Sequence, residues 1–242
     1  MPGDKVYPSF EAAVADIPDG ASVMIGGFGG PAGMPQNLIR ALRDHGAKDL
    51  TIIHNTGGFG LSFIGYASPK DVTFDDHAIL FANRQVRKFY ASYPFPPAPS
   101  ANSPCKEQFL AGEIELEIVP QGTLAERIRA GGAGIGAFYT RTGVGTEVAK
   151  GKDSKTINGE AYILEYALRA DFALVRAHRA DRLGNLVYIG TARTFNPVVA
   201  TAADITIVEV DEIVEPGAID PEHVITPFVY VDRIVEIPGG AG

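Results

Sequence analysis

Short apolar runs separated by amphipathic stretches recur along the whole chain. Runs bounded by glycine, proline or polar residues are typical of strands, whereas apolar residues three or four positions apart indicate helices. Strands alternating with helices predict an α/β fold: an open, mostly parallel, Rossmann-like sheet with helices on both faces. We expect strands at 23–25, 50–53, 86–91, 113–119, 172–175, 186–189, 205–210 and 229–234, and helices at 10–16, 36–45, 107–111, 124–130, 161–168 and 197–203.

No sharp boundary interrupts this pattern, and the sequence contains no internal repeat. The 242 residues are enough for one large domain or two small ones. We therefore expect a single domain over residues 1–242. Residues 57–83 are expected to form a loop with some helix, and residues 93–104, which contain five prolines, a stiff loop.

The first apolar run leads directly into a glycine loop, residues 26–35, which precedes the amphipathic stretch 36–45. Glycines leave backbone N–H groups uncovered, so a ligand can lie close to the chain. Open α/β sheets bind ligands at the carboxyl ends of their strands, where this loop falls. The alternative is a turn with no ligand role. The candidate binding residues are Gly26, Gly27, Phe28, Gly29, Gly30 and Gly33.

The glycine loop also approximates the phosphate-binding fingerprint of dinucleotide enzymes at Gly27, Gly29 and Gly33. Such a site usually requires an acidic residue at the end of the second strand, which holds the ribose. Here that strand ends in His54 and Asn55, and two prolines interrupt the loop. The sequence therefore does not favour a nicotinamide dinucleotide.

Two uncharged amides stand at strand ends beside glycine-rich segments: Asn55 after the second strand and Gln121 after the strand at 113–119. Amide N–H groups can stabilise an oxyanion or orient a carbonyl without carrying charge. In the competing interpretation each amide only caps a turn. The residues alone leave both interpretations open.

The composition excludes several other classes of function. The formal net charge of −8 argues against nucleic acid as a general partner. The five histidines lack metal-ligand spacing, so no metal site is expected, and the single cysteine, Cys105, cannot form an intrachain disulfide. No apolar run approaches the roughly 20 residues of a membrane span. Residues 1–18 lack the apolar core of a signal peptide, so we expect a cytoplasmic protein with no membrane partner.

Residues 19–35 resemble the signature of the class I coenzyme A transferases in their A (alpha) subunit: Asp-Gly, apolar residues, Gly-Gly-Phe and then Gly-x-Pro. Residues 120–146, which begin Pro-Gln-Gly-Thr-Leu-Ala-Glu-Arg, are similar to the A subunits of 3-oxoacid and 3-oxoadipate CoA-transferases. The resemblance covers essentially the whole chain and is weakest between residues 57 and 109. It continues at 169–175, 181–185, 192–196 and 208–215.

The resemblance implies an enzyme that moves CoA between carboxylic acids, with succinyl-CoA as donor, a 3-oxoacid as acceptor, CoA as substrate and no permanently bound cofactor. The family's nucleophile is a glutamate within a Glu-Asn-Gly motif of the B (beta) subunit, and it forms an anhydride and then a CoA thioester. This chain contains no Glu-Asn-Gly. The resemblance therefore implies activity only with a B subunit, in an A2B2 heterotetramer. Asn55 and Gln121 match residues beside that glutamate, and Gly26 to Gly30 match the loop beside the acyl group.

The sequence departs from the family pattern between residues 59 and 104, and Thr56 replaces a common second asparagine. These departures leave the acceptor acid open. Two other functions also stay open: hydrolysis of an acyl-CoA on the same scaffold, and a non-catalytic module that binds a CoA ester or a sugar phosphate. Aromatic rings near a pocket mouth suit a bulkier acid than acetoacetate, although core packing accounts for most rings. The rings are Phe59, Phe63, Tyr66, Phe74, Phe81, Phe89, Tyr90, Tyr93 and Phe95.

Overall fold

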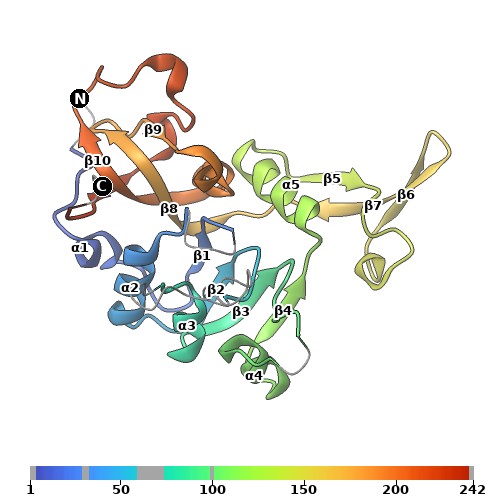
Figure 1. The fold of residues 1–242 in the computed structure, drawn as a ribbon. Helices are drawn as coiled ribbons and strands as arrows, with labels where there is room; N and C mark the ends of the chain where they lie inside the picture. Colours follow the sequence, from blue (N-terminus) through green and yellow to red (C-terminus); the bar gives the residue numbers. More distant parts are fainter. Residues whose placement is uncertain (1–3, 29–32, 59–73, 99–100, 240–242) are drawn as a thin grey trace.

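The computed structural model describes residues 4–28, 33–58, 74–98 and 101–239. Within them an eight-stranded sheet forms the centre of the molecule, in the order β11-β10-β8-β1-β2-β3-β4, with β9 paired to β8 (Figure 1). All neighbours along that order are parallel, whereas β9 is antiparallel to β8. The strands are β1 (Ser22–Ile25), β2 (Leu50–Ile53), β3 (Val86–Ala91), β4 (Glu115–Ile118), β8 (Ala170–Asp181), β9 (Leu186–Val187), β10 (Ala203–Val214) and β11 (Arg233–Glu236).

The strand order reverses at β1. The chain runs outward from β1 to β4 on one side, and it later returns to β8 and continues to β11 on the other. A crevice forms outside the carboxyl ends of the strands at such a reversal, and open α/β sheets bind their ligands there. The loops that follow β1, β2 and β3 are therefore the expected place for a ligand site.

Helices cover both faces of the sheet because successive residues of a strand point to opposite sides. Val23 and Ile25 belong to one buried apolar cluster and Met24 to the other. The first face is packed by α1 (Phe10–Val14), α2 (Gln36–His45), α3 (Ala78–Ala82) and α4 (Pro104–Leu110), and the second by α5 (Gln121–Gly132) and α6 (Asn196–Ala200) (Figure 1). The predicted fold class, an open and mostly parallel sheet with helices on both faces, is confirmed.

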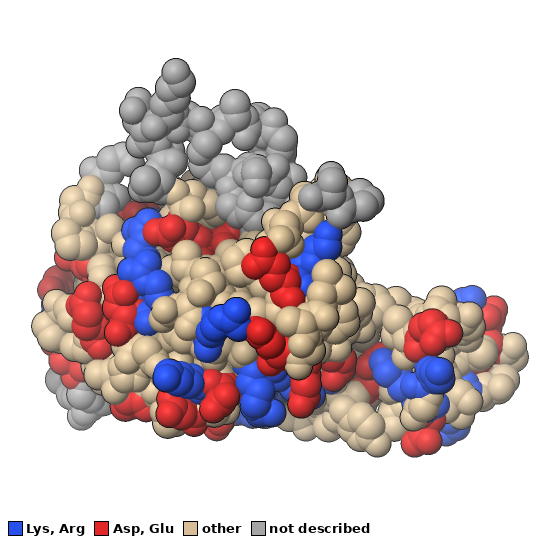
Figure 2. Space-filling model, turned by 90° about the horizontal axis from the view of Figure 1, so that it is seen from below, with Lys and Arg blue, Asp and Glu red and all other residues tan. Residues whose placement is uncertain are grey.

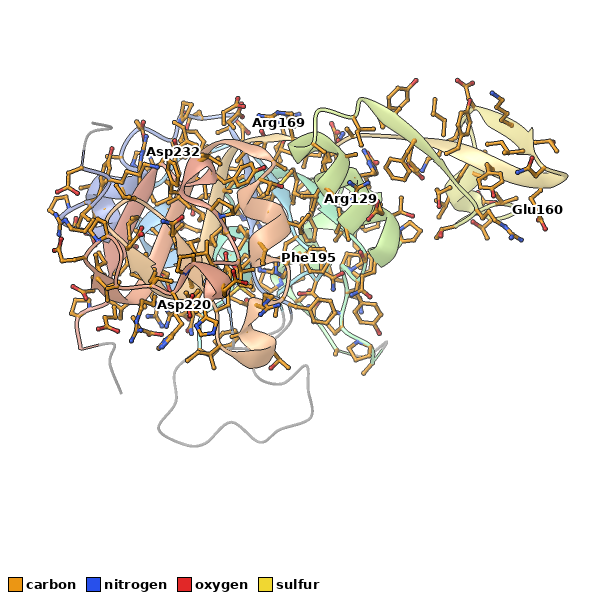
Figure 3. All side chains as sticks on the ribbon, turned by 90° about the horizontal axis from the view of Figure 1, so that it is seen from above. Arg129, Glu160, Arg169, Phe195, Asp220 and Asp232 are labelled. Carbon is orange, nitrogen blue, oxygen red and sulfur yellow. The ribbon has the colours of Figure 1, made fainter. Side chains whose placement is uncertain are left out.

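A second, antiparallel sheet extends away from the main sheet as an arm (Figures 1 and 3). It has the order β5-β7-β6, with β5 (Ala137–Thr140), β6 (Ser154–Ile157) and β7 (Glu160–Tyr166), and a short 3-10 turn, η2 (Glu147–Ala149), precedes β6. Figure 3 shows Glu160 on this arm, far from the other labelled residues. That the arm and the main sheet belong to a single domain over residues 1–242 stays a prediction.

The predicted helix at 161–168 is wrong, because most of these residues form β7. The signal that decides the structure is the dipeptide Asn158-Gly159, in which both residues have positive φ, 51° and 81°. Two such residues form the tight turn that matches the twist of a β-hairpin. Ile157 pairs with Glu160 across this turn, so β6 and β7 fold back on each other.

Several other boundaries differ from the predicted ones. β8 and β10 extend well beyond the apolar runs at 172–175 and 205–210, because they pair with each other from Ala170 and Ala203 to Asp181 and Val214. The last strand begins later than expected and follows the 3-10 turn η5 (Phe228–Tyr230). Only the first half of 186–189 is a strand, and α6 ends at Ala200. The other 3-10 turns are η3 (Gly190–Arg193) and η4 (Pro221–His223).

Two surface properties bear on the kinds of partner considered above. None of the helices in the described part of the chain is long and apolar enough to cross a membrane. On the face shown in Figure 2, Lys and Arg side chains lie between Asp and Glu side chains instead of forming one continuous basic area.

The arm joins the main body through a buried carboxylate, Glu165 on β7, whose side chain is 2% exposed. Lys152 Nζ lies 2.5 Å from Glu165 Oε1, and Arg127 Nη1 lies 4.0 Å from Oε2. The Arg127 guanidinium also bonds Glu117 Oε1 at 2.7 Å and the Tyr166 carbonyl at 2.8 Å. This cluster therefore ties β7 to α5 and β4, and α5 carries Gln121 at its first position.

We expect Glu165→Gln to lower the free energy of unfolding by about 2 kcal/mol, because Lys152 and Arg127 lose a buried charged acceptor. Glu160→Gln on the same strand is the matched control. Glu160 is 53% exposed and pairs with Arg141 at 2.9 Å, so its loss should cost less than about 0.5 kcal/mol. Urea unfolding followed by circular dichroism measures both. Equal effects would contradict a special role for the buried carboxylate.

Candidate active site

A cavity of about 300 Å³ lies at the carboxyl ends of β1, β2 and β3. Parallel pairing brings these ends to the same edge of the sheet. Asn55 follows β2, Tyr93 follows β3 and Gln121 opens α5, so residues far apart in the sequence meet there. The described lining residues are Phe28, Asn55, Thr56, Ser92, Tyr93 and Gln121.

Three of the predicted site residues, Phe28, Asn55 and Gln121, are thus brought together. Gly33 instead lines a second cavity of about 220 Å³ with Arg176 and His178. Gly29 and Gly30 lie outside the described residues. The functional roles of all these residues stay predictions.

Gly26 is not free to bind a ligand through its backbone N–H, which donates to the Leu174 carbonyl at 2.8 Å and so continues the pairing of β1 with β8. Gly27 and Gly33 have φ of +97° and +78°, a conformation that favours glycine. These glycines shape the ends of the loop, and Gly26 in addition permits close packing.

Two buried histidines, His54 and His77, hold the turn that presents Asn55. The Thr56 N–H donates to His54 Nδ1 at 3.1 Å, and His77 Nε2 donates to the Thr56 carbonyl at 2.6 Å. The Asn55 carbonyl accepts from Tyr93 N at 2.9 Å. The backbone on both sides of the Asn55 side chain is therefore fixed. This pair could not be found from the sequence, because residues 54 and 77 are distant in the chain, although His54 adjoins Asn55.

Both histidines are neutral at physiological pH. Burial lowers the pKa of His77 to about 4. Burial, and then the neighbouring His77, lower the pKa of His54 well below its ordinary value. The two rings lie 4.1 Å apart, centroid to centroid. They add no charge to the adjacent cavity.

The cavity wall contains polar atoms that lack a partner among the described residues. Asn55 is 5% exposed, and its Oδ1 has no hydrogen-bond partner there, nor has Ser92 Oγ. Buried polar groups are normally paired, because an unpaired one keeps the cost of leaving water. The residues that line the cavity therefore retain two buried oxygen atoms that are unpaired among the described groups.

None of the six described lining residues carries a charge or a carboxylate. Ser92 Oγ has no partner, so no base activates it among the described residues. α5 begins at the cavity with Gln121, and the N-terminal end of a helix favours negative charge. The arrangement can hold a carbonyl or an oxyanion, but the described wall supplies no activated nucleophile.

The far end of the glycine loop leads into α2, which Glu209 of β10 anchors. Glu209 Oε2 accepts from the backbone N–H groups of Asn37 and Leu38, each at 2.9 Å. Pro35, at the start of the helix, supplies no side-chain cap. Burial raises the pKa of Glu209 to about 7, against the effect of the two N–H donors and of Arg176. The Glu209 carboxyl group thus bonds the start of α2, the helix after the glycine loop, to β10, which lies on the β8 side of β1.

Most of the described aromatic residues of the divergent segment pack in the core. Phe81 and Phe89 are fully buried, and Phe74, Phe95 and Tyr90 pack against the two apolar clusters. Among the described rings of that segment only Tyr93 lines the cavity. Phe59, Phe63 and Tyr66 lie outside the described residues.

The fold and the site define a class: an α/β protein whose uncharged cavity lies at the carboxyl ends of the strands beside their reversal. The profile of the family described as Coenzyme A transferase matches residues 7–237. The chain therefore belongs to the coenzyme A transferase family.

Individual relatives agree with this assignment. The chain is 49% identical to the A subunit of the 3-oxoadipate CoA-transferase of Pseudomonas putida, over 98% of this chain and 96% of that protein. It is 47% identical to the A subunit of a probable succinyl-CoA:3-ketoacid coenzyme A transferase of Bacillus subtilis, over 96% and 89%. Among solved structures, an acyl-CoA transferase of E. coli O157:H7 superposes with a TM-score of 0.80 at 23% identity, over 99% of this chain and 52% of that one. That likeness concerns the fold.

We expect His77→Gln to weaken the dependence of stability on pH, since Gln can donate to Thr56 but does not titrate. Folded His77 stays neutral down to about pH 4, whereas the unfolded side chain takes up a proton near pH 6.5. Between these values the unfolded state binds more protons, so wild-type stability falls as pH falls. The wild-type free energy of unfolding minus that of the variant should decrease by about 3 kcal/mol from about pH 7 to about pH 4. Urea unfolding over this range measures it, and parallel curves would contradict the burial of a neutral His77.

Proposed function

We propose that this chain is the A subunit of a heteromeric CoA-transferase that moves CoA from succinyl-CoA to a 3-oxoacid. CoA is a substrate, and no resident cofactor takes part. The proposal rests above all on one observation: the cavity unites Asn55 and Gln121, yet its described lining contains no carboxylate. The two bacterial relatives, at 49% and 47% identity, support it.

The nucleophile in this proposal is a glutamate of the B subunit. Its carboxylate oxygen attacks the thioester carbonyl, and the CoA thiolate leaves to give a mixed anhydride. The thiolate then attacks the glutamyl carbonyl, releases the first acid and forms an enzyme–CoA thioester. The acceptor carboxylate then attacks the enzyme–CoA thioester, and the CoA thiolate leaves to give a second anhydride. The thiolate attacks the acceptor's acyl carbonyl in that anhydride, which forms the new acyl-CoA and releases the glutamate. A carboxylate is a weak nucleophile, so positioning and charge stabilisation must supply most of the rate.

The role of this chain is to hold the acyl group while negative charge develops on its carbonyl oxygen. The amides of Asn55 and Gln121 lie in the same cavity wall, and they can donate to that oxygen without placing a cation beside the attacking carboxylate. The neutral His54 and His77 fix the turn that carries Asn55 and leave that charge balance unchanged.

The first test is the need for a partner. We expect the purified chain alone to transfer no CoA, and its complex with a B subunit that bears Glu-Asn-Gly to transfer CoA from succinyl-CoA to acetoacetate or 3-oxoadipate. Robust transfer by this chain alone would refute the proposal. Release of free CoA without an acceptor would identify a hydrolase instead. Binding of CoA esters with no turnover would identify a binding module.

The second test concerns the amides. We expect Asn55→Ala and Gln121→Ala each to lower turnover of the complex by about tenfold to a thousandfold, the scale for losing one oxyanion donor. Gln85→Ala is the matched control. Gln85 is a buried amide before β3 that donates to the Leu42 and Ala47 carbonyls, so its loss should cost stability and leave turnover unchanged. Near-normal turnover in both site variants would return Asn55 and Gln121 to a structural role.

A further inference from the structure

The turn before α6 and the first residue of that helix contact the described ends of the glycine loop at Gly26, Phe28 and Gly33. Its backbone is unusual, because Thr194 has φ of 40° and ψ of −132°. A β-branched residue rarely adopts a positive φ, and such strain persists only where the surrounding structure imposes it. Strained backbone of this kind concentrates at functional sites. The contacts of the turn with the glycine loop and with β8 hold Thr194 in this conformation.

Asn196, which follows this turn, is completely buried. Its Nδ2 donates to the Gly33 carbonyl at 2.8 Å and lies 3.2 Å from both the Ala192 carbonyl and Thr194 Oγ1. Its Oδ1 accepts from the backbone N–H of Arg176 on β8 at 3.0 Å. The orientation of the amide is fixed, because the two carbonyls require a donor and the Arg176 N–H requires an acceptor. One side chain thus joins the loop, the turn and the central sheet.

At the other end of the loop, Gly26 lies against the same amide, and there is room for it only because glycine has no side chain. A Cβ placed on Gly26 would lie 1.9 Å from Asn196 Oδ1, closer than any packing contact. A Cβ on Gly33 would lie 2.2 Å from the Ala192 carbonyl. The glycines at 26 and 33 therefore let the loop approach this turn from both ends.

The residue before Asn196 adds a third contact. Phe195 stacks on Phe28 with ring centroids 6.0 Å apart and an interplanar angle of 10°. Phe28 lines the cavity that also contains Asn55 and Gln121. Figure 3 labels Phe195 in the body of the molecule, away from the arm. Two consecutive residues, Phe195 and Asn196, thus contact the loop at Gly26, Phe28 and Gly33.

We propose that Asn196 is a positioning residue for CoA transfer: its amide bonds the Gly33 end of the glycine loop to β8 and packs against Gly26 at the other end, and the strained Thr194 and the Phe195 ring complete this clamp. The inference rests on the proposed function. Asn196 is not among the described residues that line the cavity, so it acts by setting where Phe28 and Gly33 lie when the acyl group is bound.

The first experiment is Asn196→Ala in the complex with the B subunit. We expect kcat to fall by about tenfold to a hundredfold, since small displacements of positioning groups have effects of that size. The KM for succinyl-CoA should change by less than about threefold. Asn185→Ala is the control, because Asn185 bonds Asp181 and the Phe228 N–H instead of the loop. It should lower the Tm without lowering kcat. An unchanged kcat in Asn196→Ala would overturn the proposal.

Asn196→Asp provides a readout that a merely structural role would not move. A carboxylate can accept from Arg176 N–H but repels the Gly33 carbonyl, whereas a protonated carboxyl group can again donate to it. The kcat of Asn196→Asp relative to wild type should therefore rise as the pH falls from about 8 to about 5.5, while the ratio for Asn196→Ala stays constant. Identical pH profiles of the two ratios would overturn the proposal.

A thermal double-mutant cycle tests the clamp independently of catalysis, and it also covers the case in which Asn196→Ala folds poorly. Gly26→Ala alone should lower the Tm of the complex by more than about 5 °C, because its methyl group meets the Asn196 amide. In the Asn196→Ala background the same change should cost less than about 2 °C, because the methyl group then meets only the Leu174 carbonyl, at 3.3 Å. Additive effects would overturn the proposal. If the wild-type complex transfers no CoA, the proposed function fails, and this cycle still judges the clamp.

Discussion

The parallel pairing of β1 with β2 on one side and β8 on the other is the constraint on which the rest of the structure depends. Val23 pairs with both Ile52 and Phe172, so the loops after β1 and β2 and the far half of β8 reach the same edge of the sheet. The described ends of the glycine loop then contact the turn at 192–196, through Gly26, Phe28 and Gly33. Only residues without side chains permit that approach at Gly26 and Gly33. The cavity forms where the loops at the carboxyl ends of β1, β2 and β3 meet.

Burial at the same edge determines the electrostatics of the site. Side chains that anchor the loops are paired with backbone groups: His77 with Thr56, Glu209 with the start of α2 and Asn196 with Gly33. Because desolvation opposes charge, the two histidines remain neutral. An uncharged cavity of this kind suits the proposed function, because a carboxylate in the wall would repel the carboxylate nucleophile that we propose for the B subunit.

Much of the fold could be predicted from local pattern. The apolar runs at β1, β2 and β3 and the amphipathic α2 were placed correctly, because each buries a face whose period is visible in the sequence. The predicted helix at 161–168 is wrong because the residue types of β7 do not alternate between apolar and polar: of its two buried positions, one holds Ile163 and the other Glu165. The turn at Asn158-Gly159 decides its pairing. The lengths of β8 and β10 also escaped prediction, because they depend on pairing with each other and not on apolar runs.

The sequence by itself determined the kind of residues available to the site: a glycine loop after β1, amides at positions 55 and 121, and no Glu-Asn-Gly motif. It also carried the resemblance that indicates the family. Only the tertiary structure decided which of these residues meet, since Asn55, Ser92 and Gln121 adjoin one cavity through strand order. It alone showed His77 beneath Thr56 and Asn196 between Gly33 and β8. Such contacts join residues far apart in the chain, and no local periodicity records them.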